Sequence, residues 1–329
     1  MSFIRFSQVS LRSFTFFLTL PFLFWHAYGY SQPHIYTPAE GLVETKPMVI
    51  PGNIFVSGIL PSKNRVPSHL KEFGFFLSGL DEEDILEVAD FSTFVSVRYQ
   101  DTDLMEIAEK LGVKIWVSLG SVFFEGDGKK SKREDYKERW QRAKRGLLPY
   151  KNIIYAFDPL DEPFHKSLLP DNELKAYLEE IGSFLKLDFP KAKRAITFTS
   201  YTVERPRFQL VIPENFNLFG VDHYVGVDFQ GEIVNRLIMK TEHMNAKYYL
   251  IPRAFKTTSH NYRYLQQAEL VLRARQAYNF AIANSKIELI YPFQWKSFFW
   301  DSEHYYGVDS FPELRREYEK IGRSISKDR

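Results

Sequence analysis

The feature that most constrains the fold of this chain is a regular alternation of short apolar runs with longer amphipathic stretches. A short run rich in Ile, Val, Phe and Tyr is typical of a buried β-strand. The sequence contains eight such runs, at Ile54–Leu60, Thr93–Arg98, Val113–Leu119, Ile153–Phe157, Ala195–Thr199, Leu218–Asp222, Tyr248–Ile251 and Ile287–Pro292. We therefore expect eight strands, regularly spaced along the chain.

Stretches with helical spacing lie between these runs. They cover Leu70–Ala89, Asp103–Leu111, Lys129–Arg145, Asp171–Leu187, Gly231–Asn245, Tyr262–Ala283 and Pro312–Ile321, while the proline-broken connection Val203–Pro213 predicts only a degenerate helix. Strands separated by helices pair in parallel, because only a crossover returns the chain to the same end of the sheet. The pattern predicts an α/β fold, a single-domain (β/α)₈ TIM barrel over residues 53–329. An open doubly wound sheet is the alternative, but Leu60–Asn64 is not the Gly-rich phosphate turn that it needs.

The N-terminal residues predict a signal peptide over 1–29, followed by an irregular arm over 30–52. Arg5 and Arg12 give a basic start, Phe14–Trp25 is apolar, and Ala27–Gly29 is a small-x-small cleavage site. An uncleaved anchor is the competing interpretation, but the apolar segment contains Pro21 and is shorter than a bilayer span. We expect export to the periplasm or the medium after cleavage near Gly29, with no stable membrane span afterwards.

Charge and cysteine content exclude several classes of protein. The 329 residues include 43 Lys+Arg and 41 Asp+Glu, and loss of the predicted signal peptide would remove two Arg and no acid. A nearly neutral mature chain does not suggest a nucleic acid or an anionic membrane surface as partner. The chain has no cysteine, which rules out disulfides and thiolate metal sites. Aromatic residues make up 16% of the chain, a surplus that suits a cleft stacking on sugar rings.

Three carboxylates stand directly after the fourth predicted strand. Asp158, Asp161 and Glu162 follow Ile153–Phe157 and are separated by prolines. Catalytic groups of a (β/α)₈ barrel lie at the carboxyl ends of its strands, and a carboxyl that is partly desolvated beside other acids gains a raised pKa. Asp and Pro are also ordinary turn residues, so a structural role for this segment stays open.

The other strand ends supply a mixed set of polar and aromatic side chains that would face the same bowl. They are Arg98 after the second strand, Tyr201 after the fifth, Asp222, His223 and Tyr224 after the sixth, Arg253 after the seventh, and Gln294 and Trp295 after the eighth. Acids for proton transfer and polar groups for hydroxyls are what glycoside cleavage uses.

Three short motifs resemble the clan of (β/α)₈-barrel glycoside hydrolases that keep the acid/base Glu in an Asn-Glu-Pro or Asp-Glu-Pro turn after strand four. The motifs are Asp161-Glu162-Pro163, the pair His223-Tyr224 and the aromatic Trp295. The resemblance covers about Ile54 to Arg316. It implies a poly- or oligosaccharide as substrate or ligand, Glu162 as general acid, and Trp295 as the floor of a sugar subsite.

One departure from that clan changes the expected mechanism. The clan carries a nucleophilic Glu after strand seven, where this chain has Ile251-Pro252-Arg253-Ala254-Phe255 and no acid. Three possibilities follow. Asp222 or Asp158 could activate a water, the substrate could supply its own nucleophile, or the protein could be a catalytically inactive carbohydrate-binding barrel.

The residues thus receive provisional roles. Glu162, Asp161 and Asp222 are the catalytic candidates, and the candidates for substrate binding are Arg98, Asp158, Tyr201, His223, Tyr224, Arg253, Gln294 and Trp295. Structural roles compete with these: Glu162 could be salt-bridged to Arg98 or Arg253, and Trp295 could be core. No cofactor is implied, and no metal, since the eight His are scattered without ligand spacing. The sequence says nothing of the oligomeric state.

Overall fold

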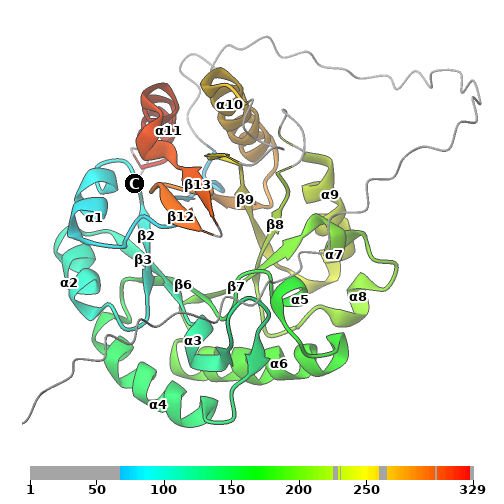
Figure 1. Cartoon of the computed structure of the whole chain (residues 1–329). Coiled ribbons are helices and arrows are strands. Elements are labelled where there is room, and N and C mark those ends of the chain that lie inside the picture. Colours follow the sequence, from blue (N-terminus) through cyan, green and yellow to red (C-terminus); the bar gives the residue numbers. More distant parts are fainter. Residues whose placement is uncertain (1–66, 225–228, 230, 259–264, 301, 327–329) are drawn as a thin grey trace, which may run out of the picture. The chain divides into compact units, whose positions relative to one another are not determined.

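A computed structural model describes residues 67–224, 229, 231–258, 265–300 and 302–326 (Figure 1). The predicted signal peptide, the arm and the predicted first strand Ile54–Leu60 lie outside these residues. Among the described residues, no helix combines the length and the apolar character needed to cross a bilayer.

The described residues form one eight-stranded parallel sheet that curls into a barrel (Figure 1). Its strands are β1 (Glu72–Phe73), β2 (Phe94–Arg98), β3 (Lys114–Ser118), β6 (Ile154–Asp158), β7 (Lys193–Thr199), β8 (Leu218–Asp222), β9 (Lys247–Ile251) and β11 (Ile287–Ile290). They pair in the order β1-β11-β9-β8-β7-β6-β3-β2. Between β2 and β1, the Thr93 N–H donates to the Phe73 carbonyl at 2.7 Å, and the Phe73 N–H donates to the Thr93 hydroxyl at 2.8 Å. The parallel barrel matches the predicted (β/α)₈ architecture.

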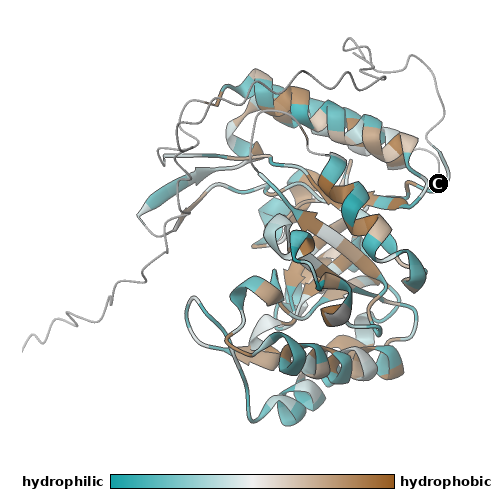
Figure 2. Ribbon diagram, turned by 90° about the vertical axis from the view of Figure 1, so that its right-hand side faces the viewer, coloured by the Kyte–Doolittle hydropathy of each residue, from teal (hydrophilic) through white to brown (hydrophobic). Residues whose placement is uncertain are grey.

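Helices cover the outside of the barrel. The longer ones are α1 (Glu82–Val88), α2 (Thr102–Lys110), α4 (Tyr136–Leu147), α6 (Asp171–Asp188), α9 (Gly231–Lys240), α10 (Gln267–Ala283) and α11 (Pro312–Ser326). Short ones follow strand ends, at α3 (Gly120–Phe123), α5 (Pro163–Lys166), α7 (Ser200–Glu204) and α8 (Phe208–Val211), with 3₁₀ turns at Leu148–Tyr150, Glu242–Met244 and Val308–Ser310. Figure 2 shows hydrophobic strands at the centre and hydrophilic residues on the helices around them.

The interior of the barrel is filled by side chains, many of them aromatic. Phe94, Trp116, Tyr249 and Tyr291 are buried in one cluster, and the rings of Trp116 and Tyr291 lie 4.6 Å apart. A side chain at Gly220 would place its Cβ 2.3 Å from the Tyr249 ring, so this position accepts only glycine. The barrel is therefore a packed core, and chemistry is confined to its ends.

The amino-terminal end of the barrel holds two buried acids, each with a cation and a hydroxyl beside it. The Glu72 carboxylate accepts from Lys114 at 2.6 Å and from the Thr93 hydroxyl at 2.7 Å. Glu288 accepts from Lys193 and from the Tyr155 hydroxyl, both at 3.3 Å.

Several predicted boundaries differ from the structure, and two of the differences add a strand that was not predicted. The first barrel strand is Glu72–Phe73, inside the predicted helix Leu70–Ala89, because this short segment pairs with β11 at the far end of the chain. Helix α4 begins at Tyr136, not at Lys129, because Ser131–Lys132 (β5) pairs with Phe124–Glu125 (β4) in a small hairpin.

A further antiparallel sheet was not predicted. Lys256–Thr257 (β10) pairs with Glu303–Tyr306 (β13), which pairs with Phe298–Trp300 (β12). We call these three strands the small sheet. They follow the carboxyl ends of β9 and β11 and lie in front of the barrel strands in Figure 1, at the end that we call the mouth.

Candidate active site

The acid cluster, which we define as Asp158, Asp161, Glu162 and Asp222, lies at the mouth. Asp158 is the last residue of β6 and is 4% exposed. One of its carboxyl oxygens accepts from the Leu160 N–H at 3.2 Å. Burial, together with the nearby Asp161, raises the pKa of Asp158 to about 8. This acid is therefore largely protonated at neutral pH.

Glu162 is positioned by an unusual backbone conformation. Its φ of 49° and ψ of 55° are left-handed, and Pro163 directly after it begins α5. Non-glycine residues take this conformation rarely, and they persist in it where the surrounding structure holds them. The Glu162 side chain is only 16% exposed. Burial and the charge of Asp161 raise its pKa, while Lys166 opposes the rise.

Lys166 is a basic side chain within the acid cluster, four residues after Glu162 on α5. Its ammonium forms an ion pair with Asp161 and lies 3.6 Å from a carboxyl oxygen of Glu162. Burial alone would lower the pKa of Lys166, but Asp161 and Glu162 outweigh it, so the pKa is raised. Lys166 therefore stays charged and offsets one carboxylate of the cluster.

Asp222 enters the cluster from the end of β8. Burial, then the charges of Glu162 and Asp161, raise its pKa well above the ordinary range, and Asp222 and Glu162 act directly on one another. One Asp222 oxygen is buried without a hydrogen-bond partner in the described structure. Two interacting, partly buried carboxyls cannot both ionise at low cost, so loss of the second proton is disfavoured. One member can then donate a proton while the other is a carboxylate.

An aromatic wall stands beside the acid cluster. Tyr224, two residues after Asp222, packs edge-on against Phe255 at 5.1 Å and lies 5.9 Å from Phe293. Phe293 also contacts Phe76 at 5.3 Å. Burial and the charge of Asp222 raise the pKa of the Tyr224 phenol, so it stays a neutral donor. Phenyl faces and a phenol next to carboxyls suit a sugar, whose rings have apolar faces and polar edges.

Known structures share this architecture. A GH113 β-1,4-mannanase superposes with a TM-score of 0.50 at 11% identity, over 78% of this chain and 99% of the mannanase. A GH10 xylanase of Thermobacillus composti gives 0.53 at 11% identity over 76% and 96% of the two chains, and xylanase 10B of Thermotoga maritima gives 0.52 at 12% over 78% and 96%. The chain has the fold of the (β/α)₈ glycoside hydrolases. Its sequence matches no protein-family model and no curated protein.

In this glycoside-hydrolase fold, the end of the seventh strand carries Arg253 where the resembled clan has its second Glu. Arg253 is 1% exposed and lies over the Phe255 ring at 5.1 Å. It donates to the Phe255 carbonyl and to the Tyr224 carbonyl, each at 3.2 Å. Arg253 therefore holds the backbone beneath the aromatic wall, and the second carboxyl at the mouth comes from β8.

His223 lies at the same strand end, between Asp222 and Tyr224. One of its ring nitrogens, Nδ1, is buried without a hydrogen-bond partner in the described structure. Burial, and secondarily the charge of Arg273, lower the pKa of His223. A neutral imidazole here can accept or donate a hydrogen bond.

Four of the predicted site residues lie outside this arrangement. Arg98 pairs with Asp101 at 2.8 Å and has a side chain 61% exposed, and Tyr201 is 70% exposed beside Arg205. Gln294 and Trp295 are fully buried. The competing interpretation paired Glu162 with Arg98 or Arg253; the cation beside Glu162 is instead Lys166.

The sugar-stacking role of Trp295 needs correction. Its indole packs between Phe75 and Phe91, with Arg315 over its ring at 5.1 Å, so it belongs to the core outside the barrel and has no exposed face to offer a ligand. The aromatic residue that lies at the mouth after the eighth strand is Phe293.

Sequence reasoning missed Lys166 and Phe293. The four-residue spacing of Glu162 and Lys166 in a helical turn could have indicated the first. For Phe293, the alternation of side chains along a strand could have indicated that it shares a face with Tyr291. The resemblance includes a Trp after the eighth strand and therefore led to Trp295, two residues later. Within the described ranges, no group of three or more acidic or histidine side chains is arranged to hold a metal ion.

Proposed function

We propose that this protein is a glycoside hydrolase that acts on a poly- or oligosaccharide, with Glu162 as the general acid. The observation that carries the proposal is the pair of interacting, partly buried carboxyls Glu162 and Asp222, whose pKa values are both raised. Cleavage of a glycosidic bond needs such a proton on the leaving oxygen. Several neighbours of the same fold are named as xylanases and mannanases, which supports a carbohydrate substrate.

Each group in the acid cluster then has a chemical task. Glu162 donates the proton of the pair to the glycosidic oxygen, and its interaction with Asp222 keeps that proton bound until substrate arrives. Once Glu162 is ionised, Asp222 and Asp161 supply negative charge near the oxocarbenium-like transition state and can orient the attacking water. The phenol of Tyr224 and the imidazole of His223 are within the same mouth to hold hydroxyls.

Loss of reducing-end release from a glycan panel tests the proposal. We expect Glu162→Gln to reduce release by a factor of about 10² or more, because a positioned general acid contributes on the order of 10²–10⁴. Asp222→Asn should also reduce release and should alter the pH profile. Glu109→Gln, on the exposed face of α2, is the matched control. Equal release by the wild type and Glu162→Gln would remove Glu162 from the mechanism.

Binding of glycans without cleavage is the second candidate function. Arg253 favours it, because a buried guanidinium stands where the resembled clan has its nucleophile. If the panel shows tight binding and no reducing ends with the wild type, the barrel is a carbohydrate-binding module.

We further propose that the protein is exported. The basic, apolar and small-residue segments of 1–29 support this. N-terminal sequencing of the protein recovered outside the cytoplasm should give a chain that starts near Tyr30, and recovery only of full-length protein in the cytoplasm would contradict export.

A further inference from the structure

The small sheet has two faces of different character. Opposite residues of antiparallel strands share a face, and the register pairs Lys256 with Tyr306 and Phe299 with His304. Thr258 is held beside His304, since its N–H donates to the His304 carbonyl and its hydroxyl accepts from the His304 N–H, both at 3.1 Å. We call this set the outer face: Lys256, Thr258, Phe299, His304 and Tyr306.

The opposite face of the small sheet joins the aromatic wall at the mouth. Tyr305 stacks on Phe298 at 4.9 Å and lies 5.7 Å from Phe255. Phe255 in turn contacts Tyr224, which stands beside Asp222. That face is used in packing, so the outer face is directed away from the acid cluster and needs another explanation.

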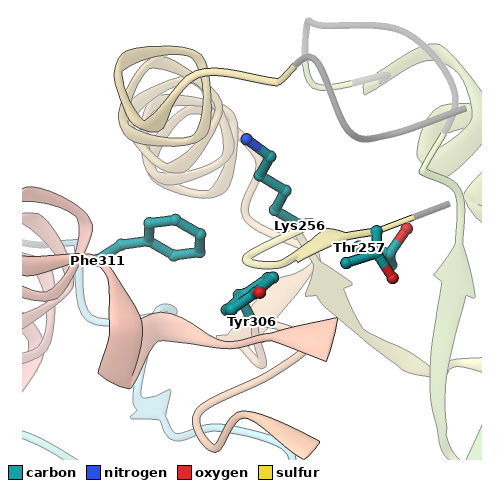
Figure 3. Close-up of a pocket in the computed structure, with 5 residues that line it drawn as sticks. Lys256, Thr257, Tyr306 and Phe311 are labelled. Carbon is teal, nitrogen blue, oxygen red and sulfur yellow. The ribbon is translucent and has the colours of Figure 1, made fainter. Parts of the chain in front are cut away.

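The outer face combines an aromatic surface with a cation. Tyr306 stacks on His304 at 4.1 Å, and Phe299 is 72% exposed. A pocket on this face is lined by Lys256, Thr257, Thr258, Tyr306 and Phe311. Figure 3 shows the Lys256 side chain extending away from β10, with the Phe311 ring to its left and the Tyr306 ring below it. No carboxylate among the described residues pairs with the Lys256 ammonium.

This set of groups selects a class of ligand. Exposed aromatic rings stack on the apolar faces of sugars, and the Thr258 hydroxyl, which already accepts from His304, keeps its own proton for a ligand oxygen. An ammonium without an acidic partner favours a ligand that carries negative charge. A neutral sugar would use the rings and the hydroxyl but would leave the charge of Lys256 unused.

We propose that the outer face of the small sheet is a binding site for an anionic saccharide. Phe299 and Tyr306 stack on its rings, and Lys256 pairs with a carboxylate or sulfate group. The site is separate from the acid cluster and does not depend on hydrolysis. It would hold an acidic stretch of a glycan next to the mouth.

Calorimetric titration of the full chain tests this site. The probes are trigalacturonic acid, the neutral trimer maltotriose and a sulfated disaccharide, so that carboxylate and sulfate ligands are distinguished. All proteins carry Glu162→Gln, which is expected to slow any cleavage of the probes during the titration. The variants are Lys256→Met, Phe299→Ala and, as matched control, Lys191→Met, an exposed lysine just before β7 at the opposite end of the barrel.

We expect Lys256→Met to weaken binding of at least one anionic probe by about tenfold or more, the size of one charge-assisted contact. Binding of maltotriose should stay within about twofold, because the aromatic surface is unchanged. Phe299→Ala should weaken all probes that bind, and Lys191→Met should weaken none. Thermal midpoints of the variants show whether each is folded.

Equal affinity of the parent and Lys256→Met for both anionic probes would overturn the proposal. So would the absence of any binding of the anionic probes at millimolar concentration. Failure of the hydrolase proposal is recognised separately, because it is read from reducing-end release by the wild type.

Discussion

The acids at the two ends of the barrel have different surroundings. At the amino-terminal end, Glu72 and Glu288 each have an ammonium and a hydroxyl within hydrogen-bond distance. At the mouth, buried Asp158 is affected by the charge of Asp161, and the partly buried Glu162 and Asp222 act on one another and are also affected by Asp161. In the described part of the mouth, the ammonium that contacts the cluster is that of Lys166, which pairs first with Asp161.

The difference separates a structural acid from a reactive one. A buried carboxylate with matched partners is stabilised in its charged form and has no reason to bind a proton. A buried carboxyl among other carboxyls must keep a proton, at a cost to stability once the pH rises. The surroundings at the mouth therefore favour the protonated form of its acids, which is the property that a general acid requires.

The largest expected effect is on the pH dependence of stability. The folded-state pKa of Asp158 is about 8, and an unfolded Asp has a pKa near 3.9. Between these values the native state keeps a proton that the unfolded state has lost, so raising the pH favours unfolding. We expect the free energy of unfolding to fall on the order of 1 kcal/mol per pH unit between pH 5 and 8.

Urea titrations at pH 5, 6.5 and 8 measure this slope. Asp158→Asn should reduce it, since Asn keeps the oxygen that accepts from Leu160 and cannot ionise. Glu109→Gln should leave the slope unchanged. Stability that is constant or rises over this range would show that the mouth acids are not protonated in the native state.

Removing a cation from the amino-terminal end should give the next largest effect. Lys114→Met leaves Glu72, whose side chain is 4% exposed, with only part of its compensation. We expect a loss on the order of 2–3 kcal/mol in the free energy of unfolding, somewhat below that of a fully buried pair because Lys114 is partly exposed. Lys110→Met, which breaks the exposed pair with Glu106, is the control and should cost less than about 1 kcal/mol. Similar losses for both variants would contradict the contrast.

A smaller effect is expected for the second acid at that end. Lys193 lies 3.3 Å from Glu288, farther than Lys114 from Glu72, and Tyr155 remains as a donor in the variant. Lys193→Met should therefore cost on the order of 1 kcal/mol by urea titration at pH 7. A loss larger than that of Lys114→Met would reverse the order of the two sites.

Lys166→Met should have the smallest effect on the free energy of unfolding. Its main effect should be on the pKa of Glu162. The ion pair with Asp161 is one-third exposed on both sides and contributes little to folding. Without the ammonium, however, the pKa of Glu162 should rise further, because the charge of Lys166 lowers it more than the hydrogen bond with Asp222 does. Carboxyl ¹³C NMR titration measures this, with Lys166→Arg as the variant that keeps the charge. If the pKa of Glu162 is unchanged or lower in Lys166→Met, the charge of Lys166 does not control the protonation of Glu162.

The sequence predicted seven of the barrel strands among the described residues, because each is a short apolar run between helical stretches. It missed β1, since Glu72–Phe73 is defined by its pairing with β11 and not by any local pattern. The small sheet was missed for the same reason: β10 and β13 lie far apart in the sequence and each is short.

The sequence predicted the site residues that lie at the ends of strands. It did not predict the positions of residues farther along, where the path of the chain depends on tertiary packing. Asp158 and Asp222 are the last residues of β6 and β8, Glu162 comes four residues after β6, and all three lie at the mouth. Trp295 lies after the chain has left the barrel, and its burial against Phe75 follows from tertiary packing that no local pattern encodes.

The short first strand has a consequence for synthesis of the protein. Because Phe73 pairs with Ile290, β1 leaves the ribosome long before its neighbour β11 exists. Until then, the nascent barrel is an open sheet with an unpaired edge at β9, and such edges invite pairing with other chains. Ring closure is thus a late event of high contact order, and the yield of native protein would depend on how well that edge is shielded until translation is nearly finished.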